Sequence, residues 1–146
     1  MNWLGDFVQT QLAPEDEVLD LGCGIMQATL DVIPAYPKTR LRCKRLLGVD
    51  IHQPSLDFLK ERGIETLQHD LTELPLPLPD KSFDVVIFTD LFEHLRLYQA
   101  EDLVNEAQRL ARKKIICSTP KEFRRNEYST SVDYFNIANQ PTVRKI

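Results

Sequence analysis

The stretch Val18-Leu19-Asp20-Leu21-Gly22-Cys23-Gly24 decides the fold of this chain. An apolar run that ends in a carboxylate and continues as Gly-x-Gly predicts a strand that turns sharply into a helix. Glycines in such a turn let the backbone approach a ligand, and the N-terminus of the next helix presents N–H groups. A second apolar run ends in Gly48-Val49-Asp50, where a carboxylate can accept hydrogen bonds from ribose hydroxyls. Together the two motifs predict a pocket for a cofactor that contains a nucleoside.

Length and composition are those of an ordinary folded domain. The 146 residues predict a single domain over residues 1–146 with one hydrophobic core, and 42% are hydrophobic and 27% charged. The net charge of −4 gives no support for non-specific binding along a nucleic-acid backbone. Two short basic runs, residues 38–45 and 109–114, are interpreted as solvated surface.

The cysteines and the N-terminus bear on the cellular compartment. Cys23, Cys43 and Cys117 have no metal-ligand spacing, so we expect no metal site, and their odd number argues against a disulfide framework. Residues 1–7 lack the basic start and long apolar stretch of a signal peptide. No apolar run approaches the roughly 20 residues that a membrane helix needs. These features predict a cytoplasmic protein without a membrane segment.

Helical and strand patterns alternate along the chain. The expected helices cover residues 2–12, 25–33, 54–62, 90–98 and 101–111, and the expected strands cover 17–21, 46–50, 64–68, 83–89 and 114–118. Alternating leucine and proline over residues 74–79 exclude regular structure there, and the tail 121–146 is interpreted as irregular. The order predicts an α/β fold, Rossmann-like and doubly wound, with a mostly parallel sheet of about five strands and helices on both faces.

Four carboxylates fall at the ends of expected strands. Ligands of parallel α/β sheets bind beyond the carboxyl ends of the strands. The residues at these ends are Asp20, Asp50, Asp70 and Asp90. We therefore expect one ligand-binding rim that contains all four.

From about residue 15 to about residue 120 the chain resembles the class I S-adenosylmethionine-dependent methyltransferases. The segments that carry the resemblance are residues 18–24, 48–51, 69–71, 83–86 leading to 93–95, and 118–120. The resemblance implies S-adenosyl-L-methionine as the cofactor. It also implies methyl transfer to an oxygen, nitrogen or carbon nucleophile, with a small molecule as the expected acceptor.

The resemblance assigns the first set of cofactor contacts to the glycine loop. Gly22, Cys23 and Gly24 would pass close to the methionine portion, and Asp20 would fix the loop and bind the amino group. Cys23 is interpreted as a small residue that fits the turn rather than as a nucleophile. An alternative for Asp20 is a cap for the helix that follows it.

Further contacts are implied at the ends of the second and third strands. Asp50 would bind both ribose hydroxyls, and Ile51 would pack on the face of the adenine. Asp70 would accept the exocyclic amine of the adenine, and Leu71 would offer its backbone N–H to the ring. For Asp50 too, capping of the following helix is the alternative.

The expected catalytic region follows the fourth strand. Thr89 would lie beside the methionine carboxylate, and Asp90 would lie beside the reactive methyl group. His94 could take a proton from the acceptor or could be a helix-surface residue. Asp90 and His94 are the two catalytic candidates, although alignment alone supplies much of the rate of a methyl transfer, so a dedicated base is not required.

The chain departs from the family pattern in three respects. The third glycine of the loop is replaced by Met26, which must turn away from the cofactor or intrude on it. The connection between the first two strands is long and contains the basic run 38–45. The family's usual last two strands are expected to be lacking, so we expect an open sheet edge that could pair with a second copy or a partner chain.

Two other functions remain as alternatives. The first is a non-catalytic S-adenosylmethionine-binding module or partner-dependent subunit, which Met26 and the short C-terminus favour. The second is a nicotinamide-dependent oxidoreductase, which Gln27 disfavours because it takes the place of the third fingerprint glycine. Nucleic-acid methylation is not expected, because Thr89-Asp90-Leu91-Phe92 stands where amino-methylating DNA enzymes carry Asn/Asp-Pro-Pro-aromatic.

Overall fold

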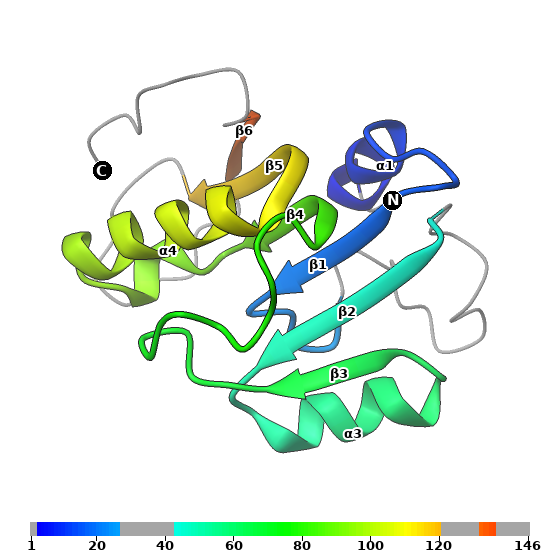
Figure 1. Ribbon diagram of the computed structural model, residues 1–146, viewed down its shortest axis with the longest axis horizontal. Coiled ribbons are helices and arrows are strands. Elements are labelled where there is room, and N and C mark those ends of the chain that lie inside the picture. Colours follow the sequence, from blue (N-terminus) through cyan, green and yellow to red (C-terminus); the bar gives the residue numbers. More distant parts are fainter. Residues whose placement is uncertain (1–2, 27–42, 121–131, 137–146) are drawn as a thin grey trace.

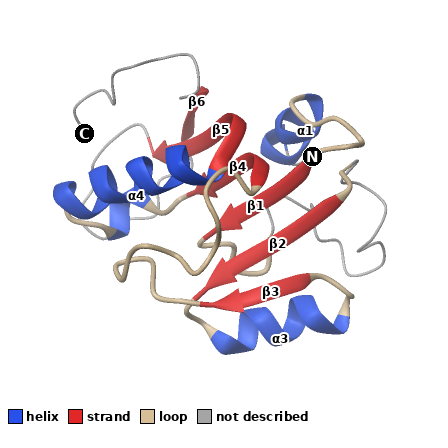
Figure 2. Ribbon diagram, in the orientation of Figure 1, coloured by secondary structure: helices blue, strands red, loops and turns tan. Residues whose placement is uncertain are grey.

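The computed structural model describes residues 3–26, 43–120 and 132–136. Within these residues one sheet of six strands has the order β3-β2-β1-β4-β5-β6, with helices packed against it (Figures 1 and 2). The elements are α1 (Trp3–Thr10), β1 (Glu17–Leu21), β2 (Arg45–Asp50), α3 (Gln53–Glu61), β3 (Glu65–Gln68), β4 (Phe83–Thr89), the 3-10 turn η1 (Phe92–His94), α4 (Leu97–Leu110), β5 (Ala111–Pro120) and β6 (Val132–Asn136).

The expected parallel α/β sheet is confirmed. Strands β1 to β5 pair in parallel, and their order in the sheet, β3-β2-β1-β4-β5, places β1 and β4 at the centre of the six strands. The expected helix over residues 25–33 falls largely outside the described residues, and Ile25 and Met26 are not helical. The basic run 38–45 is described only from residue 43 onward.

Strand β6 corrects one expectation. It pairs antiparallel with β5, with Cys117 opposite Phe135. The place beside β5 is therefore occupied by a strand of this chain, so at least one strand follows the fifth, and β6 now forms the edge of the sheet. Pairing of the sheet with a second copy or a partner chain stays a prediction. The tail gave no such signal, because a five-residue edge strand needs no apolar periodicity when β5 supplies its ladder of hydrogen bonds.

The two faces of the sheet bury different side chains. In β4, Val86 and Phe88 pack in the cluster that contains the apolar stripe of α4. Val85 and Ile87 point the other way, into a smaller cluster with Val8 of α1. All residues of β4 from Phe83 to Phe88 are buried, as a central strand covered on both faces requires.

The helix expected over residues 90–98 is not formed. A short 3-10 turn, η1, ends at His94, and the extended backbone of Leu95 (φ −111°, ψ 149°) separates it from α4. Arg96 is also extended, and its N–H donates to Oε1 of Gln99 at 3.0 Å, which starts α4 as a new helix. Sequence periodicity missed this break because both flanking segments carry helix-compatible residues.

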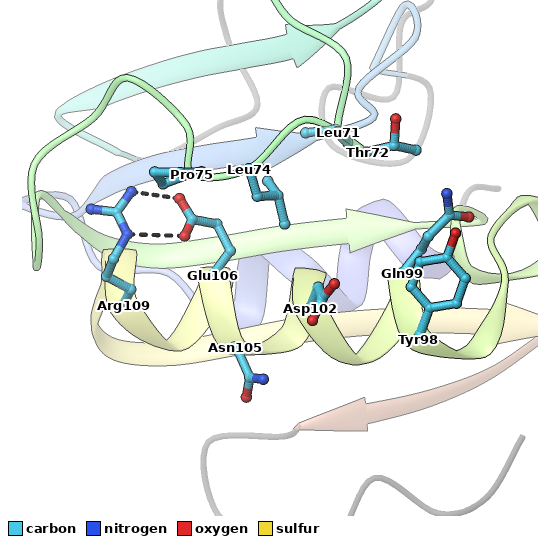
Figure 3. Close-up of a pocket in the computed structure, with 10 residues that line it drawn as sticks. All are labelled: Leu71, Thr72, Leu74, Pro75, Tyr98, Gln99, Asp102, Asn105, Glu106 and Arg109. Carbon is cyan, nitrogen blue, oxygen red and sulfur yellow. Dashed lines mark hydrogen bonds and ion pairs between the residues drawn. The ribbon is translucent and has the colours of Figure 1, made fainter.

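The Leu-Pro segment, residues 74–79, has no regular structure, as expected, and α4 holds it in place. Oε1 of Glu106 accepts the N–H of Leu76 at 2.9 Å, and Arg109 donates to the carbonyls of Leu76 and Leu78. Figure 3 shows the Glu106–Arg109 pair at one end of a groove of about 630 Å³ between α4 and residues 71–75. These hydrogen bonds connect the segment to α4.

A charged network joins the amino ends of the central strands. Asp84 at the start of β4 is 8% exposed. Its Oδ2 accepts the N–H of Glu17 at 2.9 Å, and its Oδ1 accepts Nε of Arg112 at 3.0 Å. Arg112 also binds the carboxylate of Glu17, so one side chain ties β5 to both β1 and β4. Asp84 therefore has a structural role at the amino ends of β1, β4 and β5.

Met26 turns away from the glycine loop into the core. Its side chain is 1% exposed and packs with Cys23, Leu56 and Leu59. Gly48 of β2 makes room for it, because a Cβ at Gly48 would lie 2.5 Å from Cε of Met26 and 2.8 Å from Sγ of Cys23. The backbone of Met26 has φ 58°, the left-handed conformation that favours glycine, and the buried thioether offsets that strain.

We expect Gly48→Ala to lower the free energy of unfolding by about 1–3 kcal/mol, the usual cost of overpacking a core. The added methyl group must displace the ends of Met26 and Cys23. Urea denaturation followed by circular dichroism measures the change. Unchanged stability would contradict the close packing of Met26 on Gly48.

Candidate cofactor site

The glycine loop is fixed to the end of β2. The N–H groups of Gly22 and Cys23 both donate to the carbonyl of Val49, at 2.8 and 3.1 Å. Gly22 has φ 65° and Gly24 has φ 49°, a conformation that few L side chains adopt. A Cβ built on Gly24 would meet no atom within 4 Å among the described residues, so the loop faces open space at this point.

Asp50 joins this loop to the start of α3. Its Oδ2 accepts the N–H of Gly24 and its Oδ1 accepts the N–H of His52, both at 2.8 Å. The N-cap residue of α3 is His52, so Asp50 stabilises the approach to the helix without being its cap. A carboxylate has about four acceptor positions, and these two bonds leave the others for a ligand.

An exposed apolar side chain stands next to Asp50. Ile51 is 61% exposed, and its carbonyl accepts Nε2 of Gln68 at 3.2 Å. The N–H of His69 donates to the carbonyl of Asp50 at 3.1 Å, which brings the end of β3 beside the end of β2. An exposed apolar side chain at a strand end offers apolar surface on which a planar ring can be buried.

Asp70 forms a tight turn at the end of β3. Its Oδ1 accepts the hydroxyl of Thr72 at 2.7 Å and the N–H of Thr72 at 2.9 Å. These hydrogen bonds lower the pKa of Asp70, so the group stays ionised. The side chain of Leu71 is 9% exposed and packs in the core, so the contact expected with the adenine would come from its backbone N–H.

Two residues of the first motif are buried beneath the loop. Asp20 is 2% exposed at the end of β1. Cys23 is 8% exposed, and its Sγ lies 3.4 Å from the carbonyl oxygen of Gly24. Burial, together with the charges of Asp20 and Asp50, raises the pKa of the Cys23 thiol well above its ordinary value. A thiol with so little thiolate is a packing group rather than a nucleophile.

The segment after β4 places two carboxylates near each other. Asp90 has φ 50°, and its N–H donates to the carbonyl of Ser118 at 3.1 Å. Burial raises the pKa of Asp90, and burial together with the charge of Asp90 raises the pKa of Glu93. Glu93 was not among the catalytic candidates from sequence; it lies in the η1 turn, where the charge of Asp90 acts on it. Thr89 ends β4 opposite Ser118, on the same rim.

His94 is the least constrained of the expected catalytic residues. Its side chain is 73% exposed, and its Nε2 lies 4.0 Å from Oε1 of Glu93. A general base must be oriented toward the proton that it accepts, and this imidazole interacts with the charges of Asp90 and Glu93 without a short hydrogen bond to either among the described residues. Asp90 and Glu93 therefore stand beside His94 as candidate proton acceptors.

The part of the chain that the structure describes lacks two kinds of feature. No group of three or more His, Cys, Asp or Glu side chains there is placed to hold a metal ion. No helix there is long and apolar enough to cross a membrane.

Comparison with known families adds to this geometry. Residues 19–117 match the family described as a methyltransferase domain. The chain belongs to this family. The matched segment of the methyltransferase domain runs from β1 to β5 and includes the glycine loop, Asp50, Asp70 and Asp90.

The sequence identity between this methyltransferase domain and its individual relatives is low. The chain is 33% identical over 104 residues to the bifunctional methionine biosynthesis protein MetXA/MetW of Rhodopirellula baltica, covering 68% of this chain and 16% of that protein. The PH0226 protein of Pyrococcus horikoshii has a TM-score of 0.62 and 23% identity, with 80% of this chain and 55% of that one covered. Phosphoethanolamine N-methyltransferase 1 of Haemonchus contortus, solved with phosphoethanolamine and S-adenosylhomocysteine, has a TM-score of 0.64 and 18% identity, with 90% and 30% covered.

The chain matches only part of the length of each relative. The chain spans 16% of the curated relative and about half or less of the two solved structures. The two solved structures are 23% and 18% identical to this chain, and at this identity the similarity concerns the fold alone. They support the Rossmann-like architecture that the sequence predicted.

Proposed function

We propose that this domain binds S-adenosyl-L-methionine and transfers its methyl group to a small-molecule acceptor. The observation that carries the proposal is the position of the Asp50 carboxylate. It accepts the N–H of Gly24, at a point of the glycine loop where a Cβ would meet no atom of the described residues within 4 Å. A carboxylate with spare acceptor positions at the end of β2 suits a ribose diol. The family match over residues 19–117 supports the same assignment.

The remaining contacts of the cofactor follow from the rim. Ile51 would cover one face of the adenine, while Asp70 and the backbone of Leu71 would bind its edge. The methionine portion would lie on Gly22, Cys23 and Gly24 near Thr89, with Asp20 below the loop. The exposed side chain of Ile51 and the open space at Gly24 leave room for such a ligand among the described residues.

Methyl transfer at this site would need alignment more than acid–base chemistry. The cofactor supplies a sulfonium-bound methyl group that a lone pair of the acceptor can attack. Asp90 and Glu93 would lie on the acceptor side, and the raised pKa of each would make it a better proton acceptor than an ordinary carboxylate. His94 stays a candidate that would have to be reoriented by the acceptor.

The acceptor class and location are parts of the same proposal. The name of the Haemonchus contortus neighbour states a small acceptor, phosphoethanolamine, which supports a small molecule here without identifying it. The free cysteines Cys23, Cys43 and Cys117 suit a reducing compartment, and we place the protein in the cytoplasm on that basis. Burial of Met26 removes one argument for a non-catalytic module, because its side chain does not intrude on the loop.

Calorimetric titration of the purified chain with S-adenosylmethionine, S-adenosylhomocysteine and NAD tests the proposal. We expect micromolar binding of the first two ligands and none of NAD. Binding of NAD instead, or of none of the three, would contradict it. If the first two bind, release of S-adenosylhomocysteine can then be followed across a panel of small acceptors.

A further inference from the structure

The side chain of Leu91 lies directly on Gly22. A Cβ built on Gly22 would have Cδ1, Cδ2 and Cγ of Leu91 as its three nearest atoms, at 3.1, 3.3 and 3.6 Å. Leu91 belongs to the segment after β4, and Gly22 begins the loop after β1. These strands are neighbours in the sheet, with Leu21 opposite Phe88. One side chain thus links the cofactor loop to the segment expected to face the acceptor.

Leu91 is itself held from both sides. The preceding residue, Asp90, adopts φ 50°, and its N–H donates to the carbonyl of Ser118 at 3.1 Å. The carbonyl of Leu91 accepts the N–H of His94 at 3.1 Å, and its side chain packs against the core cluster that contains Phe88 and Phe92. An aspartate in the left-handed region costs free energy that the surrounding structure must offset. That conformation turns the chain back from β4 toward the glycine loop.

The opposite side of the loop is held by β2. The carbonyl of Val49 accepts the N–H groups of Gly22 and Cys23. Gly22 therefore lies between a hydrogen-bonding anchor and an apolar one. A loop clamped in this way cannot shift without breaking one of the two contacts.

We propose that Leu91 is a positioning residue that sets the place of the glycine loop relative to Asp90 and Glu93. The inference rests on the proposed function, since the loop matters for catalysis only if it carries the methyl donor. Leu91 acts through Gly22 rather than on the ligand. Its role is to keep donor and acceptor in alignment, which supplies much of the rate of a methyl transfer.

The first test compares cofactor affinity among leucine variants. We expect Leu91→Ala to raise the Kd for S-adenosylhomocysteine about tenfold, because the loop loses one of its two anchors. Leu91→Met, which keeps a side chain of similar volume, should restore binding to near the wild-type value. Leu78→Ala is the matched control, since Leu78 is also partly buried against the same core but lies in the Leu-Pro segment.

Two outcomes of this titration would overturn the inference. One is wild-type affinity in Leu91→Ala. The other is an equal loss in Leu91→Ala and Leu78→Ala, which would make the effect one of general stability. If the wild-type chain does not bind S-adenosylhomocysteine at all, the proposed function fails, and the contact is judged by the second test.

The second test needs no ligand. The midpoint of thermal unfolding is measured for Gly22→Ala, for Leu91→Ala and for the double variant. We expect the decrease caused by Gly22→Ala to be smaller in the Leu91→Ala background, because the side chain that meets the new methyl group is gone. Additive decreases would show that Leu91 does not anchor Gly22, and would overturn the inference whatever the cofactor.

Discussion

Asp50→Ala is expected to weaken the binding of S-adenosylhomocysteine about 100-fold or more. Two hydrogen bonds from ribose hydroxyls to a charged carboxylate together contribute roughly 3 kcal/mol or more, and tenfold in Kd corresponds to about 1.4 kcal/mol. The variant also loses the acceptors for Gly24 and His52, so the loop and the start of α3 lose their shared anchor. Titration calorimetry measures the change.

The control for this variant is another aspartate close by in the sequence. Asp57→Ala removes an exposed carboxylate of α3 that accepts Nε2 of Gln53, a local pair worth about 0.5 kcal/mol or less. It should leave the affinity unchanged. Asp50→Asn keeps one acceptor oxygen and should lie between wild type and Asp50→Ala. Wild-type affinity in Asp50→Ala would mean that the ribose is not held at the end of β2.

Asp84→Ala is expected to lower the free energy of unfolding by about 3 kcal/mol. The substitution leaves the N–H of Glu17 without its acceptor and removes one of the two carboxylates that bind Arg112. Breaking a buried ion pair costs about 3–5 kcal/mol, and the lower figure applies because the Arg112 side chain is 36% exposed. Urea denaturation at neutral pH measures it.

The same carboxylate should make stability depend on acid pH. The hydrogen bond from Arg112, reinforced by that from Glu17 and by the charge of Lys113, lowers the pKa of Asp84 to about 2. A folded-state pKa below the unfolded value means that the stabilisation is complete above about pH 4 and is lost as pH falls through about 2. After allowance for screening at the exposed Arg112, this contribution is about 1–2 kcal/mol.

The comparison of wild type with Asp84→Ala isolates this contribution from other carboxylates. The difference in unfolding free energy between the two should shrink as pH falls from about 5 to about 2. Asp80→Ala is the control, because the Asp80 side chain is 77% exposed and its pair with Arg109 is worth about 1 kcal/mol or less. A difference that stays constant with pH would contradict a lowered pKa at Asp84.

Local patterns were enough to predict the architecture. The buried run of β4 and the glycine turn after β1 each carry their signal within a few residues, and the alternation of strands and helices fixes a parallel sheet. The aspartates at the strand ends follow from the same reasoning, because the carboxyl ends of parallel strands meet at one edge. These features depend on the order of residues in the chain, so the sequence alone determined them.

Contacts between distant residues were decided only by the tertiary structure. The packing of Met26 against Gly48, the cover of Leu91 over Gly22, and the binding of Gly24 by Asp50 each join segments that the sequence keeps apart. Strand β6 forms because β5 offers an edge, and the helix before α4 is broken by backbone angles at Asp90 and Leu95. The periodicity of the sequence shows which face of a helix or strand is apolar. A contact between two particular side chains depends also on which residues the neighbouring strands and loops place beside that face.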